Sequence, residues 1–92
     1  MGFELGMTVM TMGVHEEMER NYDFMVFVAD SLERYIGCDW GEMCDEDKAE
    51  NEYSLMYGGR IFASYEKEGF PKIWIITEWD RSTTTILFPS EY

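Results

Sequence analysis

The 92 residues have the length of one domain, and a content of 46% apolar and 16% aromatic residues argues against intrinsic disorder. There are 19 acidic and 7 basic residues, which give a formal net charge of −12. The length therefore predicts a single domain over residues 1–92. Because the negative charge repels nucleic acids and anionic membranes and attracts basic protein surfaces, we expect this domain to bind another protein.

The N-terminal part predicts a short strand and two helices. Phe3–Met12 alternates weakly, although methionine is a poor strand former. The i, i+4 spacing of Val14 and Met18 predicts a short acidic helix. Asp23 is an N-cap candidate for a second helix, and Gly37 is suited to the C′ position that ends it. The apolar stripe of the second helix is Phe24, Phe27, Val28, Leu32, Tyr35 and Ile36.

A third helix is predicted to begin at Cys44 or Asp45 and to end at Gly58-Gly59. Its first turn is acidic, and the positive end of the helix dipole favours carboxylates there. The buried side of this helix is expected to consist of Ala49, Tyr53 and Met56.

After Gly59 the hydrophobic period changes to two residues and predicts strands over Arg60–Glu66, Lys72–Trp79 and Thr83–Phe88. The continuous apolar run from Ile73 to Ile76 is typical of a central strand that is covered on both faces. The short connections predict a three-stranded antiparallel meander, to which the N-terminal segment can add a fourth strand. Helices followed by strands indicate an α+β fold with N-terminal helices packed on the sheet.

The negative charge is concentrated in the helical half. Residues 15–52 contain 13 acids and 3 bases, whereas residues 60–88 contain four of each. The acidity is therefore expected to form one face of the molecule, centred on the third helix and the turn before it. The residues predicted to contact a partner are Asp39, Trp40, Glu42, Asp45, Glu46, Asp47, Glu50, Asn51 and Glu52.

Three of these residues have a second interpretation. Trp40, on a turn beside a carboxylate, is suited to anchor an interface, but the favoured interpretation is that it caps the edge of the core between two helices, because Trp is mostly buried. Asp47 and Asn51 share a helix face, where they can present a polar pair to a partner or bond back to the preceding turn. The commoner role of carboxylates on a helix is to form a solvated face.

Signals for enzyme activity are weak. The sequence has no nucleophile-elbow, P-loop, dinucleotide-binding or zinc-protease motif, and its one histidine, His15, leaves little scope for nucleophile activation. Cys38 and Cys44 supply too few ligands for structural zinc, and they indicate reduced thiols in a cytoplasmic protein. The Glu78–Ser82 segment carries carboxylates beside Arg81, for which an ion pair with Asp80 or with helical acids is the commoner role. We expect no enzyme, metal or cofactor.

Several segments of the chain carry a resemblance: Cys38–Gly41, Glu46-Asp47, Asn51-Glu52, Arg60-Ile61, Tyr65, Lys72–Glu78, Asp80–Ser82, Thr84-Thr85 and Pro89–Tyr92. Together they resemble a family of short proteins that are usually labelled "plasmid-related" and are carried on bacterial plasmids, prophages and integrative elements. The resemblance covers nearly the whole chain from Phe3 and departs from the family at Cys38 and Trp79, where its members have small residues. The family has no established activity, so no catalytic residue is carried over.

The resemblance implies a setting in which small acidic proteins often inhibit host defence, as anti-CRISPR proteins do by covering a basic nucleic-acid-binding surface. The leading hypothesis is therefore an inhibitor whose acidic face binds a host nuclease or CRISPR effector. One alternative is an accessory, regulatory or antitoxin-like protein of the mobile element, which could form a homodimer through a sheet edge. The other is a small metal-dependent enzyme that uses Asp39, Asp47 and Glu78.

Overall fold

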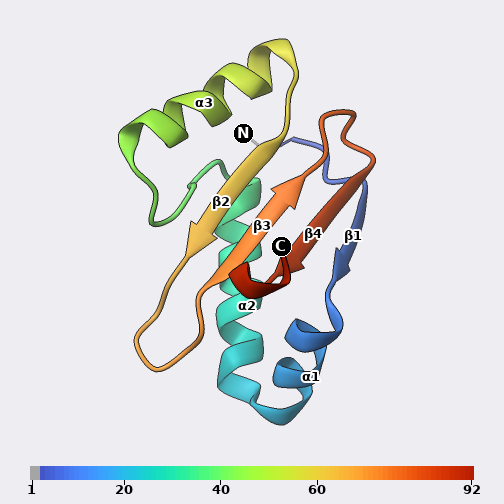
Figure 1. Cartoon of the computed structure of the whole chain (residues 1–92), viewed down its shortest axis with the longest axis vertical. Helices are drawn as coiled ribbons and strands as arrows, with labels where there is room; N and C mark the ends of the chain where they lie inside the picture. Colours follow the sequence, from blue (N-terminus) through green and yellow to red (C-terminus); the bar gives the residue numbers. More distant parts are fainter. Residues whose placement is uncertain (1–2) are drawn as a thin grey trace.

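The computed structural model describes residues 3–92 and shows one sheet with helices on one face and at one edge (Figure 1). The strand order is β1-β4-β3-β2. The strands are β1 (Met7–Met10), β2 (Ile61–Tyr65), β3 (Ile73–Thr77) and β4 (Thr83–Leu87). The helices are α1 (Met12–Arg20), α2 (Tyr22–Ile36), α3 (Asp45–Tyr57) and a final 3-10 turn (Pro89–Glu91).

The sheet confirms the α+β class but corrects the expected strand arrangement. β2, β3 and β4 pair antiparallel in chain order, and β3 is an inner strand as its apolar run predicts. However, the N-terminal strand does join the sheet, and it pairs parallel with β4. The sheet is therefore four-stranded and mixed, and the expectation of a three-stranded antiparallel meander is wrong for the sheet as a whole. A strand can find a parallel partner far along the chain, and hydrophobic alternation does not encode that choice.

The ends of α2 differ from the expected ones by one or two residues. Its N-cap is Asn21, whose side chain accepts a hydrogen bond from the backbone N–H of Phe24, so Asp23 lies in the first turn instead. At the other end Gly37 has a φ of −84°, and Cys38 takes the left-handed conformation with a φ of 66°. A residue with a Cβ thus occupies the backbone conformation that glycine adopts most easily.

The core lies between α2 and one face of the sheet. Four residues of the predicted stripe of α2 are buried, namely Phe24, Phe27, Val28 and Tyr35. Leu32 is partly buried against them, and Ile36, at the end of the helix, is exposed, contrary to expectation. The four buried residues meet one face of β2, β3 and β4, formed by alternate residues that point to the same side of each strand and are all buried. That face consists of Ile61, Ala63, Tyr65, Ile73, Ile75, Thr77, Thr84 and Ile86.

A chain of hydroxyl groups crosses this core. Thr84 Oγ1 donates to the carbonyl oxygen of Leu5 at 2.7 Å, so its lone pairs must accept from Thr77 Oγ1 at 2.8 Å. Thr77 in turn accepts from the Tyr35 hydroxyl at 2.7 Å. Each buried hydroxyl therefore has a partner, and the chain joins α2, the two inner strands and the segment before β1. Burial also raises the pKa of the Tyr35 hydroxyl.

The expected buried side of α3 is wrong. Ala49, Tyr53 and Met56 are exposed, whereas Asn51 and Ser54 are buried. The reason is that α3 packs against the edge of a sheet, where backbone N–H and C=O groups need polar partners, rather than against an apolar face.

Candidate functional site

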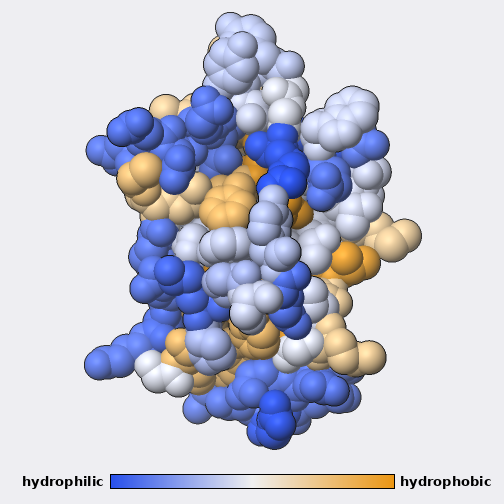
Figure 2. Space-filling view, viewed as in Figure 1, coloured by the Kyte–Doolittle hydropathy of each residue, from blue (hydrophilic) through white to orange (hydrophobic). Residues whose placement is uncertain are grey.

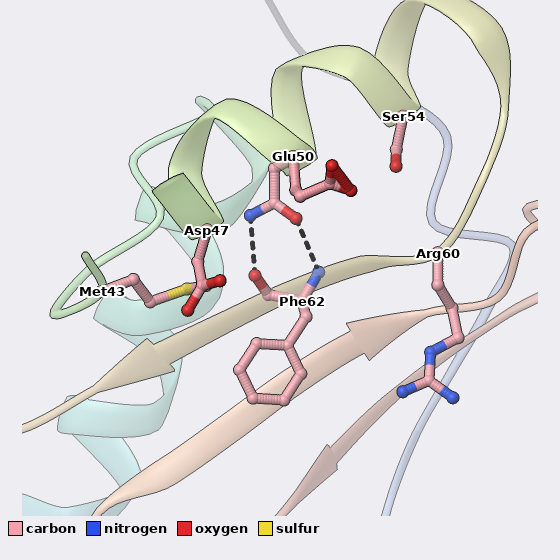
Figure 3. Close-up of a pocket in the computed structure, with 7 residues that line it drawn as sticks. Met43, Asp47, Glu50, Ser54, Arg60 and Phe62 are labelled. Atoms are coloured by element: carbon pink, nitrogen blue, oxygen red, sulfur yellow. Dashed lines mark hydrogen bonds between the residues drawn. The ribbon is translucent and has the colours of Figure 1, made fainter. Parts of the chain in front are cut away.

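The Asn51 side chain of α3 lies against the outer edge of β2. The Asn51 carboxamide donates to the carbonyl oxygen of Phe62 at 2.7 Å and accepts from its N–H at 3.1 Å (Figure 3). These two bonds replace the pair that a neighbouring strand would make. Because Asn51 is only 3% exposed, the contact is part of the fold.

The segment before α3 completes this edge. The N–H of Glu42 donates to the Ser64 carbonyl oxygen at 2.7 Å, and the N–H of Ser64 reaches the carbonyl oxygen of Trp40 at 3.4 Å. The Glu42 carboxylate then accepts from the N–H of Glu66 at 3.2 Å. A second chain that paired along β2 would have to break these bonds.

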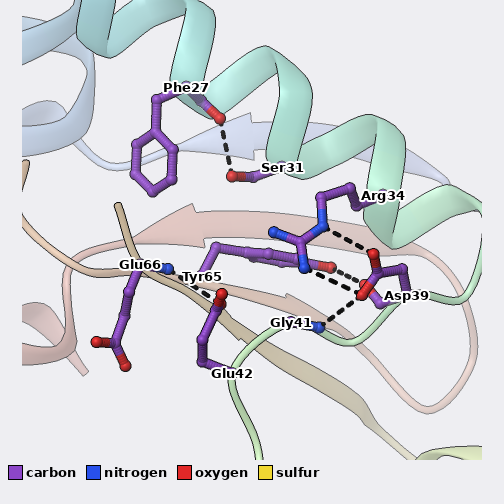
Figure 4. A network of polar contacts seen from close by, with 8 residues as sticks. All are labelled: Phe27, Ser31, Arg34, Asp39, Gly41, Glu42, Tyr65 and Glu66. Atoms are coloured by element: carbon purple, nitrogen blue, oxygen red, sulfur yellow. Dashed lines mark hydrogen bonds and ion pairs between the residues drawn. The ribbon is translucent and has the colours of Figure 1, made fainter. Parts of the chain in front are cut away.

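A polar network holds the turn at residues 38–42 (Figure 4). Arg34 contacts the Asp39 carboxylate with Nε at 2.8 Å and Nη2 at 3.2 Å, and its guanidinium lies 5.1 Å from the Tyr65 ring centroid. The hydrogen bond from Arg34 holds the pKa of Asp39 below its usual value. Tyr65 donates its hydroxyl to the Asp39 carbonyl oxygen at 2.6 Å, and burial raises the pKa of that hydroxyl. Gly41 has a φ of 77°, and a Cβ there would collide with the Ser64 carbonyl oxygen.

Trp40 closes the edge of the core. Its side chain is 3% exposed, and its ring makes edge and tilted contacts with Tyr35 and Phe3. The indole N–H donates to the Glu52 carboxylate at 2.8 Å, which ties the turn to the second half of α3. The interpretation of Trp40 as a residue that caps the core edge therefore matches its position, and its ring is not available as an exposed anchor.

The predicted partner-binding residues thus separate into two groups. Trp40 and Asn51 are buried, and Asp39, Glu42 and Glu52 hold other parts of the chain. The second group is exposed, and its side chains make no hydrogen bond or ion pair with any other residue in the range 3–92. This group, which we call the α3 acids, consists of Asp45, Glu46, Asp47 and Glu50.

A groove of about 300 Å³ runs between α3 and β2 (Figure 3). Asp47 and Glu50 line it from the helix, and Arg60 and Phe62 line it from the strand side. The Arg60 guanidinium is directed away from both carboxylates, and it donates to the Tyr92 hydroxyl at 2.6 Å. The groove contains neither Asp39 nor Glu78, so the three carboxylates of the enzyme hypothesis are not gathered in it. In the part of the chain described, no three His, Cys, Asp or Glu residues are grouped as metal ligands.

Sequence patterns did not reveal the role of Arg81. Its guanidinium contacts four backbone carbonyl oxygens at 2.6–3.2 Å, and no carboxylate accepts from it among residues 3–92, contrary to the expected ion pair. One of these carbonyls is that of Ser54, in the last turns of α3, where a positive charge also complements the helix dipole. The four carbonyls belong to Ser54, Gly59, Glu78 and Trp79.

Three contacts therefore hold the second half of α3: Glu52 to the preceding turn, Asn51 to β2 and the Ser54 carbonyl to Arg81. Among the described residues no helix is long and apolar enough to cross a membrane. A comparison with protein-family models found no match, and comparisons with curated proteins and with solved structures found none either.

Proposed function

We propose that this chain is a protein-binding module of a mobile genetic element that inhibits a cytoplasmic host defence nuclease, in the manner of anti-CRISPR proteins. It would place α3 on a basic surface of that nuclease and exclude nucleic acid from it. The observation that supports this proposal is the group of four α3 acids, exposed and without internal partners on a helix that is held at three points.

The spacing of these charges resembles that of a nucleic acid. At 1.5 Å per residue, the stretch from Asp45 to Glu50 spans about 7.5 Å of helix axis. Four carboxylates, separated by three intervals over that length, lie roughly 2.5 Å apart along the axis, compared with the ~1.7 Å per charge of duplex DNA. A rigid helix also loses little conformational entropy when it binds, which favours affinity.

The test is inhibition of a purified CRISPR effector nuclease, measured at about 0.1 M and about 0.5 M salt. We expect weaker inhibition at high salt, and we expect the triple variant Glu46→Gln, Asp47→Asn, Glu50→Gln to lose most of the inhibition. The matched control is Glu16→Gln, Asp23→Asn, Glu33→Gln, which removes the same charge from exposed positions on α1 and α2. Inhibition that ignores salt, or that falls equally in both variants, would contradict the proposal.

A second candidate is an accessory or antitoxin-like protein that acts as a homodimer. The observation in its favour is the outer side of β1, which has no partner strand among residues 3–92 and carries the exposed Met7 and Met10. Light scattering over a wide concentration range tests it. A dimer that disappears in a Thr8→Pro variant would support this candidate, and a monomer at all concentrations would exclude self-association.

A further inference from the structure

The outward face of α3 carries an apolar stripe that nothing in the described chain covers. Tyr53 is 61% exposed, Met56 76% and Tyr57 69%. The ring centroids of the two tyrosines lie 4.8 Å apart. With the exposed Ala49 these three residues fall within a sector of about 100° on a helix with 3.6 residues per turn. Figure 2 shows α3 as strongly hydrophilic over its first turns and paler towards its C-terminal end.

Carboxylates border this stripe on both sides. On the same helical geometry Glu50 lies along one side, and Asp45 and Glu52 lie along the other. Glu46 lies within the sector of the stripe itself, at its N-terminal end. The one base of the helix, Lys48, is half-buried and lies toward the side that faces the sheet. The outward face thus has the order acidic, apolar, acidic, with no positive charge among its own residues.

We propose that this face is the docking surface for a basic amphipathic helix of a partner protein. The partner's apolar side chains would pack on Tyr53, Met56 and Tyr57, and Lys or Arg residues on both sides of its apolar stripe would meet the bordering carboxylates. Tyrosine and methionine are enriched at the centres of interfaces, and tyrosine is common among the residues that dominate binding energy. The inference rests on the proposed function and adds an apolar centre to the purely acidic contact.

Other occupants fit this surface less well. A nucleic acid or an anionic membrane would bring phosphates against the carboxylates. A second copy of the chain in a twofold arrangement would oppose the same acids to one another. Charge complementarity therefore favours a basic segment, and the two exposed rings favour one with an apolar stripe.

The probe is a synthetic 20-residue helical peptide with leucines on one stripe and lysines on both sides of it. A scrambled peptide of identical composition keeps the charge but has no stripe, and a third peptide has glutamate in place of every lysine. Binding is measured by fluorescence anisotropy at about 0.15 M salt. We expect the amphipathic peptide to bind at least about tenfold more tightly than the scrambled one, and the glutamate peptide not to bind.

Matched variants locate the contact. Met56→Ala with Tyr57→Ala removes one exposed methionine and one exposed tyrosine from the stripe, and we expect it to weaken binding about tenfold or more. Met12→Ala with Tyr22→Ala removes the same exposed pair elsewhere and should leave affinity unchanged. Circular dichroism confirms that both variants are folded. Equal binding of both lysine peptides, equal affinity of both variants, or dimerisation through α3 would overturn the inference.

These results are separable from those of the nuclease assay. If Met56→Ala with Tyr57→Ala still inhibits the nuclease fully while the neutralised α3 acids do not, the proposed function stands and the apolar centre is wrong. If the peptide results are as expected but no nuclease is inhibited, the docking surface stands and the proposed partner class is wrong.

Discussion

Replacement of Asn51 by leucine tests the contact that positions α3. Leucine has a similar size but cannot replace either bond to Phe62, whose N–H at 3.1 Å and carbonyl at 2.7 Å would lose their partners. A buried backbone group without a partner costs about 1–3 kcal/mol. Because this site lies at a strand edge that water can partly reach, we expect a loss of about 2–4 kcal/mol, a large share of the ~5–15 kcal/mol that stabilises a typical domain.

The assay is urea unfolding combined with amide hydrogen exchange. Glu46→Leu, at an exposed position of the same helix, is the control and should change the free energy of unfolding by less than about 0.5 kcal/mol. We expect Asn51→Leu to lower the unfolding midpoint and to speed exchange of the Phe62 amide. An unchanged midpoint together with a protected Phe62 amide would show that Asn51 does not hold the helix on the strand.

Asn51→Asp adds a dependence on pH with a defined sign. Only a protonated carboxyl can both donate to the Phe62 carbonyl and accept from its N–H, so folding should raise the pKa of the introduced group. The stabilisation from the protonated carboxyl is then fully present below the pKa that this carboxyl has in the unfolded chain, near ~4. It is lost as the pH rises through the higher pKa that the carboxyl has in the folded protein. The stability deficit relative to the native chain should therefore grow between about pH 4 and pH 7. A deficit that shrinks over this range would refute the assigned hydrogen bonds.

Three further predictions concern the core and the turn before α3. Thr77→Val interrupts the hydroxyl chain and should lower the free energy of unfolding by about 1–3 kcal/mol, measured in urea. Tyr35→Phe removes only the terminal donor of the chain and should lower it by less. A larger loss for Tyr35→Phe than for Thr77→Val would contradict the assigned donor directions. Gly41→Ala places a Cβ against the Ser64 carbonyl at a positive φ and should cost at least about 2 kcal/mol; a neutral result would show that the bridge to β2 does not form. Arg34→Gln should raise the pKa of Asp39 in an NMR titration. Since the native pKa is lowered, the stabilisation by this exposed pair, below ~1 kcal/mol, is present at neutral pH and lost as pH falls below about 4. A pKa of Asp39 unchanged by Arg34→Gln would disprove the assigned pair.

The candidate surface was only partly visible in the sequence. The clustering of acids in residues 15–52 indicated the acidic helix, and four of its acids are exposed without internal partners. The role of Arg81 was not visible, because a guanidinium that binds backbone carbonyls leaves no pattern in side-chain types. Asn51 and Ser54 are uncharged polar residues three positions apart, a spacing that places them on one side of α3. The structure shows that this side is buried, so the spacing was a signal in the sequence that a polar side of the helix faces the protein.

Local periodicity by itself determined the three C-terminal strands, the buried stripe of α2 and the existence of α3, because each depends on neighbouring residues along one element. Only the tertiary structure decided the parallel pairing of β1 with β4 and the side of α3 that faces inward. Both depend on which backbone groups at the edges of the sheet need partners. Because the β2 edge needs polar partners, Asn51 faces inward and Tyr53, Met56 and Tyr57 remain on the outside.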